Sequence, residues 1–183
     1  MMKLLVVLGS EREGRAGAKV ADWFLPIARE RADVDFADLK EVNLPLEMEA
    51  VSPSQRQDGN YPRPEDKAWG ERVKTADAVV LVMPEYNHGY SATIKNAIDH
   101  IYHEWNGKPV GFVGYGVSGA VHAIENIAPV LGRIQADVIM EPRVGINEIW
   151  AAFDENGQLK DGDEHKRNAI AMLEALETKV ATK

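Results

Sequence analysis

The stretch "DAVVLVMPEYNHGYSATIKNAID", residues 77–99, decides the fold, because it passes from a strand pattern to a helix pattern through an unusual loop. Residues 78–83 are apolar without interruption, as expected of a strand that is covered on both faces of a sheet. Residues 94–101 repeat isoleucine and alanine at the spacing of one helix face. The loop between them is richer in Pro, Tyr, Asn and Gly than a plain connection requires, which indicates that its backbone holds a flat ligand.

The same strand-then-helix unit recurs along the chain. Apolar runs of strand length occupy Lys3–Leu8, Val34–Leu39, Ala78–Met83, Pro109–Gly114 and Asp137–Met140. Segments with helical spacing follow most of them, and a last helix is predicted over roughly residues 164–180. Five strands alternating with five helices predict one α/β domain over residues 1–183, a doubly wound parallel sheet with right-handed crossovers.

Composition excludes several classes of partner. The chain has 21 Lys and Arg residues against 29 Asp and Glu residues, a formal net charge of −8. This balance argues against nucleic acid and against anionic membrane. Cysteine is absent, so a disulfide framework and thiolate chemistry are excluded. The N-terminus reads as a first strand and not as a signal peptide, and we expect a cytoplasmic protein.

The loop after the first strand, "GSEREGRAGAK", has the composition of an anion site. We expect Gly9, Gly14 and Gly17 to let backbone amides turn inward, with a helix N-terminus at about Ala16. Amides and a helix N-terminus together form a cradle for a phosphate group.

Two arginines strengthen this interpretation. Arg12 and Arg15 carry fork-shaped donors that suit a phosphate, in a chain whose overall charge is negative. The alternative is a solvated turn in which both arginines pair with Glu11 and Glu13. The loop favours phosphate.

The loop at residues 84–91 offers groups for a planar ligand. Pro84 ends the strand pattern and has no amide to donate. Tyr86, Asn87 and His88 supply an aromatic face and side-chain hydrogen bonds, and Ser91 is suited to cap the following helix.

A third loop, "GYGVSGA" at residues 114–120, consists mainly of small residues that permit close approach of a planar group. It also matches the dinucleotide fingerprint, but after the fourth strand and not the first, so we interpret that match as accidental. The segment "GVSGA" differs by one residue from the nucleophile-elbow motif, with Ser118 as the candidate nucleophile. A hydrolase would also need an acid and then a histidine further along the chain, and His165 lies in a polar tail. A phosphate cradle with two such loops describes a mononucleotide with an aromatic base or flavin.

Other residues that bear functional groups have simpler explanations. His100 and His103 do not have zincin spacing, so we expect surface histidines and no metal site. Trp23 and Trp69 are expected to pack in or near the core. Packing is also expected for Tyr90 and Trp105, with a place beside the planar ligand or in a subunit contact as the alternatives. The long segment 41–64 is predicted to be a lid or a subunit contact.

With these three loops, the chain resembles the NAD(P)H-dependent FMN reductase family, flavodoxin-like enzymes that include quinone, azo-dye and chromate reductases. The matching segments are "GSEREGRAG", "PEYNHGYSATIKNAID" and "YGVSGAVHAIE". The resemblance implies the strand order 2-1-3-4-5 with helices on both faces, FMN as cofactor and NADPH or NADH as electron donor. The third loop carries Gly119, Ala120 and His122 where the family commonly has Gly-Gly and then Arg, so the preferred nicotinamide stays open.

The resemblance also implies which residues bind the cofactor. The first loop would bind the phosphate, the second would hold the isoalloxazine ring and ribityl chain, and the third would line the other edge of the ring. The implied residues are Ser10, Arg12, Arg15 and Gly17; then Pro84, Glu85, Tyr86 and Asn87; and then Gly116, Val117, Ser118 and Gly119.

The implied activity is an oxidoreductase that passes hydride from nicotinamide to flavin and then to a quinone, azo compound, oxyanion or free flavin. No catalytic side chain is expected, because the flavin carries the chemistry. A homodimer or homotetramer is implied. The alternative is a non-enzymatic electron carrier of flavodoxin type, against which the arginine-bearing loop and PEYN both argue.

Overall fold

The computed structural model describes residues 1–57 and 59–182. Its elements in chain order are β1 (Met2–Leu8), α1 (Gly17–Arg29), β2 (Ala32–Asp38), α2 (Leu39–Val42), η1 (Pro53–Gln55), α3 (Pro64–Thr75), β3 (Ala78–Pro84), α4 (Ala92–Asp99), η2 (His103–Trp105), β4 (Pro109–Tyr115), α5 (Val121–Arg133), β5 (Asp137–Val138), β6 (Val144–Ile146) and α6 (Gly162–Ala181). The last helix lies where the sequence predicts it, and η1, η2 and the short helix α2 are additions.

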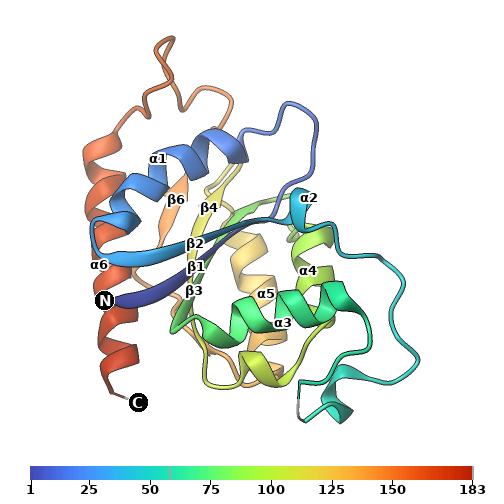
Figure 1. The fold of residues 1–183 in the computed structure, drawn as a ribbon. Coiled ribbons are helices and arrows are strands. Elements are labelled where there is room, and N and C mark those ends of the chain that lie inside the picture. Colours follow the sequence, from blue (N-terminus) through green and yellow to red (C-terminus); the bar gives the residue numbers. More distant parts are fainter. Residues whose placement is uncertain (58, 183) are drawn as a thin grey trace.

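The strands form one six-stranded parallel sheet with the order β2-β1-β3-β4-β5, which confirms the predicted order (Figure 1). Leu4 of β1 lies beside Val34 of β2 on one side and Ala78 of β3 on the other. The chain therefore winds outward from β1 in both directions, and the loops after β1 and β3 diverge at the carboxyl edge of the sheet. Such a switch point is where open α/β sheets bind ligands.

The fifth strand differs from the prediction for residues 137–140. Only Asp137–Val138 pair as β5, beside Pro109 and Val110, and β6 pairs with the other end of β4. Pro142 lies between β5 and β6 and has no amide to donate to a ladder. Since β6 spans only Val144–Ile146, it is too short for a periodic pattern, and the sequence prediction missed it.

Helices cover both faces of the sheet (Figure 1). One buried cluster joins the sheet to α1 and α6, and a second joins it to α3, α4 and α5. Trp69 and Trp105 are buried in the second cluster, which confirms that they pack in the core. The indole Nε1 of Trp69 donates to the carbonyl of Ala97 at 2.7 Å, so its polar atom is satisfied.

Ser91 connects α4 to the loop after β1. Its hydroxyl accepts from the amide of Ile94 at 3.3 Å, which confirms the predicted helix cap. The same hydroxyl donates to the carbonyl of Gly9 at 2.6 Å. The first and second candidate loops are therefore held together at their bases.

His100 contradicts the expectation of a surface histidine, because it is 2% exposed. Its Nδ1 lies 2.6 Å from the Asp66 carboxylate, and its Nε2 donates to the carbonyl of Pro45 at 2.7 Å. A buried histidine needs partners for both ring nitrogens, and α3 and the long segment supply them. The sequence reading missed this because the partners are far away in the chain.

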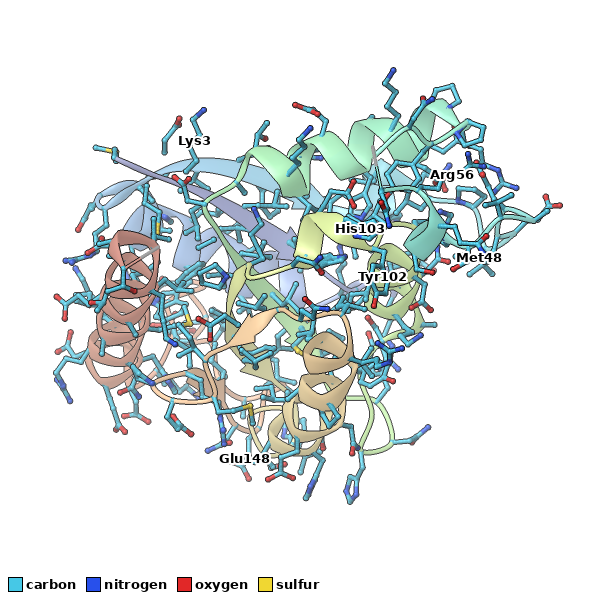
Figure 2. The ribbon with its side chains drawn as sticks, turned by 90° about the horizontal axis from the view of Figure 1, so that it is seen from below. Lys3, Met48, Arg56, Tyr102, His103 and Glu148 are labelled. Carbon is cyan, nitrogen blue, oxygen red and sulfur yellow. The ribbon has the colours of Figure 1, made fainter. Side chains whose placement is uncertain are left out.

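The long segment lies against one end of the molecule, where Figure 2 shows Met48 and Arg56 near Tyr102 and His103. The ring of His103 lies 3.0 Å from the carbonyl of Ser54 through Nε2. Arg56 pairs with Glu49 at 3.0 Å within the segment. Side-chain contacts thus attach the segment to the body of the protein.

Candidate functional site

A cavity of about 220 Å³ lies at the carboxyl edge of the sheet. It is lined by Ser10, Arg12, Arg15 and Ala16 after β1, Pro84, Glu85 and Tyr86 at the end of β3, Tyr115, Gly116 and Val117 at the end of β4, and Ile149 and Trp150 after β6. The three loops singled out in the sequence therefore meet around one space.

Four predicted binding residues do not line this cavity: Gly17, Asn87, Ser118 and Gly119. The prediction omitted Ala16, Tyr115, Ile149 and Trp150, which do. Tyr115 belongs to the third loop, residues 114–120, so its position was a usable signal. Ile149 and Trp150 follow the strand that the sequence prediction missed, and no pattern marked them.

The glycines of the first loop have different roles. Only Gly14 has a positive φ, +64°, so it alone needs glycine for its backbone conformation. A Cβ on Gly9 would lie 2.1 Å from Cδ1 of Ile94, and one on Gly17 would lie 2.2 Å from Oη of Tyr115. Both glycines thus allow close packing. The expectation of an inward-turned amide is wrong for Gly9, whose amide donates to the carbonyl of Val82 at 3.0 Å.

Arg15 pairs with Asp38, at the end of β2, and not with Glu11 or Glu13. Both guanidinium nitrogens donate to the carboxylate, with Nη1 to Oδ1 at 2.7 Å. The carboxylate hydrogen bond raises the pKa of Arg15, and burial opposes it. Asp38 is 7% exposed, so this pair is largely removed from water and fixes the guanidinium in the cavity wall.

Arg12 and Ser10 connect the first loop to Tyr86. The Arg12 guanidinium lies over the Tyr86 ring, 4.7 Å from its centroid, a cation–π contact. The hydroxyls of Ser10 and Tyr86 are 2.9 Å apart. Arg12 thus stays beside the cavity without a carboxylate partner in the structure described, and its charge faces the space that a phosphate would need.

The "YNHG" segment is a tight turn. The amide of Tyr86 donates to the carbonyl of Gly89 at 2.8 Å, and that of Gly89 donates back at 2.9 Å. Asn87 and His88 both have positive φ, 51° and 60°, the pattern of a type I′ turn. Asn tolerates this conformation, so the turn explains why Asn87 is exposed and outside the cavity.

The third loop packs closely against the chain after β6. A Cβ on Gly119 would lie 2.9 Å from the Cα of Gly145, and its φ is +64°, so only glycine fits there. The amides of Glu148 and Ile149 donate to the carbonyls of Val117 and Gly116. These bonds bring Trp150 to the rim of the cavity, where it is 68% exposed.

The cavity fits the phosphate end of FMN. Helix α1 begins without a side-chain cap and without an acidic residue in its first turn, so its first amides are available to an anion. Arg12 supplies positive charge, and the buried hydroxyl of Tyr115 has no hydrogen-bond partner in the described part of the chain. Pro84, Glu85, Gly116 and Val117 continue the wall toward the other two loops.

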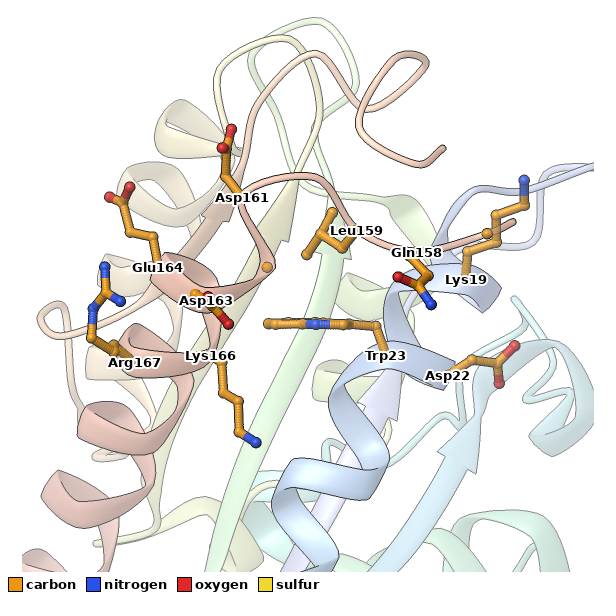
Figure 3. Close-up of a pocket in the computed structure, with 12 residues that line it drawn as sticks. Lys19, Asp22, Trp23, Gln158, Leu159, Asp161, Asp163, Glu164, Lys166 and Arg167 are labelled. Carbon is orange, nitrogen blue, oxygen red and sulfur yellow. The ribbon is translucent and has the colours of Figure 1, made fainter. Parts of the chain in front are cut away.

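A larger and more open cavity, about 1040 Å³, lies between α1 and the start of α6 (Figure 3). Trp23 lies across it, and its acidic residues include Asp161, Asp163 and Glu164. It shares no lining residue with the first cavity and contains none of the three loops. Its basic residues, Lys19, Lys166 and Arg167, lie among four acidic ones.

Two features are absent from residues 1–57 and 59–182. No helix there has the length and apolar character needed to cross a bilayer. No group of three or more His, Asp or Glu side chains there is arranged to hold a metal ion.

The fold is flavodoxin-like, and three loops at the carboxyl edge of its sheet line one cavity whose donors suit a phosphate. The family model for "NADPH-dependent FMN reductase" matches residues 2–151. The chain belongs to this family. It is therefore an oxidoreductase that depends on FMN and NAD(P)H, and family membership favours an enzyme over a non-enzymatic electron carrier.

Individual relatives agree with this placement. An NAD(P)H-dependent FMN reductase of Schizosaccharomyces pombe is 37% identical over 138 residues, which cover 74% of this chain and 68% of the relative. A 2-hydroxy-1,4-benzoquinone reductase of a Burkholderia species is 27% identical, with coverage of 90% and 89%. The solved structure of FerB, an NAD(P)H:acceptor oxidoreductase of Paracoccus denitrificans, has a TM-score of 0.78 at 24% identity and covers 98% of this chain and 99% of its own. That structural likeness supports the fold.

Proposed function

We propose that residues 1–183 act as one FMN-binding domain that carries electrons from NADH or NADPH to a small aromatic acceptor, a quinone or an azo compound. The observation that supports this most directly is the cavity between the three loops, which combines an anion site with an apolar rim. Relatives named as benzoquinone reductase and FMN-dependent NADPH-azoreductase support the acceptor class.

In this proposal the protein binds and orients, and FMN, when bound, supplies the capacity to accept and donate two electrons. The start of α1, Ser10, Arg12 and Arg15 hold the phosphate. Pro84–Tyr86 and Gly116–Val117 hold the planar ring system. Gly17 contributes as the first residue of α1, whereas Asn87, Ser118 and Gly119 act through the shape of the loops, because their side chains do not line the cavity.

The rim favours a flat, apolar acceptor. Val117 and Trp150 are each 68% exposed although both are large and apolar, and both border the cavity. An aromatic acceptor or a nicotinamide ring that stacks there would remove this surface from water. One face that serves donor and acceptor in turn predicts ping-pong kinetics.

The proposal also includes a homodimer and a cytoplasmic location. Exposed apolar residues support the homodimer. Leu46 is 81% exposed, and Met48 and Val51 on the same segment are about half as exposed, at 40% and 41%. A second copy of the chain would cover such a patch. Light scattering at working concentration should give twice the mass of the chain, and a monomer would refute the dimer.

The decisive experiment is a visible spectrum of the purified protein after incubation with FMN, followed by anaerobic addition of NADH or NADPH. We expect a bound flavin spectrum that either nicotinamide bleaches directly and that a quinone restores. A protein that stays yellow until a separate reductase is added would be a carrier. A chain that binds no FMN by calorimetry would refute the proposal entirely.

A further inference from the structure

Tyr115 is the last residue of β4, yet its side chain reaches the start of α1. Its hydroxyl lies 2.2 Å from the position that a Cβ on Gly17 would take, and Gly17 is the first residue of the helix. The residue is 4% exposed and lines the cavity together with Arg12 and Arg15. The hydroxyl is thus buried and directed at the helix N-terminus.

This hydroxyl has no hydrogen-bond partner among the described residues. The Ser10 hydroxyl is close enough to oppose the rise that burial causes in the pKa of Tyr115, but its hydrogen bond within the usual distance and angle limits is the one with Tyr86, at 2.9 Å. A buried hydroxyl without a partner is costly, so such a group in a native structure calls for an explanation. A ligand group that accepts a hydrogen bond would provide one.

The protonation state of the Tyr115 hydroxyl allows it to donate a hydrogen bond to an anion. Burial raises the pKa of Tyr115, and the nearby Ser10, Arg15 and Arg12 oppose this only in part. The phenol therefore keeps its proton at neutral pH and can donate it in a hydrogen bond. The phenol O–H, the amides at the helix N-terminus and the guanidinium can therefore all donate hydrogen bonds to one anion.

The charges around this point favour an anion of low charge. Arg15 is offset by Asp38, with which it forms a bidentate pair. Arg12 is the guanidinium that faces the cavity without such a partner in the described structure. One free guanidinium, the helix N-terminus and neutral hydroxyl donors match a phosphate monoester.

We propose that Tyr115 is a phosphate-binding residue, whose Oη–H donates to a phosphate oxygen of FMN at the N-terminus of α1. This rests on the proposed function, because it assumes that FMN occupies the cavity. It adds a residue from a third part of the chain to the phosphate site. Because Tyr115 directly precedes Gly116 and Val117, the phosphate end and the ring end of the site would be fixed by one continuous segment.

The test is Tyr115→Phe, with the affinities for FMN and riboflavin measured by flavin fluorescence quenching. Riboflavin lacks the phosphate, so it reports every other contact. A hydrogen bond to a charged group corresponds to roughly a tenfold to hundredfold change in affinity. We expect the variant to lose affinity for FMN by about that factor and to bind riboflavin as the wild type does.

The control is Tyr102→Phe, which removes a phenol that accepts from Arg133 at 3.3 Å outside the cavity. It should bind both flavins normally. Without flavin, Tyr115→Phe should melt no lower than the wild type, because the lost hydroxyl has no partner. Inorganic phosphate should raise the melting temperature of the wild type more than that of Tyr115→Phe.

Several results would overturn the proposal. These are equal losses for FMN and riboflavin, no loss for either, or a variant that fails to fold, since all three assign the hydroxyl a different role. Failure of the wild type itself to bind FMN would instead refute the proposed function, so the two failures are distinguishable.

Discussion

The carboxylate of Glu85 accepts a hydrogen bond from the backbone amide of His122, from Oε2 to N at 3.0 Å. The same oxygen accepts from the amide of Ala123 at 3.2 Å. Helix α5 begins after Ala120, which is left-handed and offers no side-chain cap. An acidic residue of the second loop therefore caps the helix that follows the third loop, and the two loops form one unit.

Replacing Glu85 by Ala should lower the free energy of unfolding by about 1 to 2 kcal/mol, because two helix amides lose their acceptor. Glu85→Gln should cost less, since an amide oxygen still accepts. Urea unfolding of the FMN-free protein measures both. Glu125→Gln, an exposed carboxylate on the same helix, is the control, and equal midpoints for it and Glu85→Ala would contradict the capping role.

Arg15→Ala should weaken FMN retention more than Lys40→Ala and should also destabilise the fold. It leaves the Asp38 carboxylate buried beside the phosphate site without its charged partner, although the hydrogen bond from the Lys40 amide remains. Losing one partner of a buried pair of this kind costs about 3 kcal/mol. Released flavin per chain and urea unfolding measure the two effects.

The double variant Arg15→Ala/Asp38→Ala tests whether the buried Asp38 carboxylate causes the loss of stability in Arg15→Ala. Removing the carboxylate as well should recover part of the stability, because the two changes are coupled. Additive losses, or equal flavin retention in Arg15→Ala and Lys40→Ala, would show that the pair does not support the site.

Gly17→Ala should destabilise the protein although alanine is the better helix former. The new Cβ would lie 2.2 Å from Oη of Tyr115 and 2.9 Å from Cδ1 of Leu8, and overpacking of this kind costs roughly 1 to 3 kcal/mol. Gly132→Ala in α5 is the matched control, because nothing lies within 4 Å of its added Cβ. It should stabilise by up to about 1 kcal/mol. Thermal unfolding of both variants checks the opposite signs.

His165 should make stability depend on pH. Burial lowers the pKa of His165 below its ordinary 6.5, and the nearby Glu164 and Asp161 oppose this only in part. The unfolded chain therefore takes up a proton near pH 6.5 that the folded chain resists, so stability is complete above that pH and falls as the pH drops. His165→Gln should lose less stability than the wild type between pH 7.5 and pH 5.5 in urea unfolding. Parallel curves would contradict this.

Local patterns in the sequence predicted much of the fold. The run Ala78–Met83 and the isoleucines that follow it specify a buried strand and a helix wherever they lie, because hydrophobic periodicity reports burial directly. Ser91 was identified as a cap from its residue type, because a serine just before a helix pattern can accept from an amide of the first turn. In contrast, β6 was missed, since it pairs with β4 only because the chain returns beside it after Pro142.

The candidate site, like the fold, was predictable only in part. Glycines, arginines and an aromatic turn marked the three loops, and the resemblance to a family named their cofactor. The partners of individual side chains were not predictable. Arg15 meets Asp38, Glu85 meets α5 and His100 meets Asp66 across distances in the chain that no local pattern encodes.

The sequence by itself determined the alternation of strands and helices along the chain and indicated the phosphate-type loop, because these follow from residue types at short spacing. The cofactor was implied by the resemblance to a family. Only the tertiary structure decided which polar atoms are satisfied and which are left over. The hydroxyl of Tyr115 shows this difference. From its position in the sequence, Tyr115 is predicted only to end a strand. In the structure its hydroxyl is buried against the start of α1 and has no partner in the described part of the chain. Burial and the lack of a partner arise only when distant segments pack together, so the sequence could not show them.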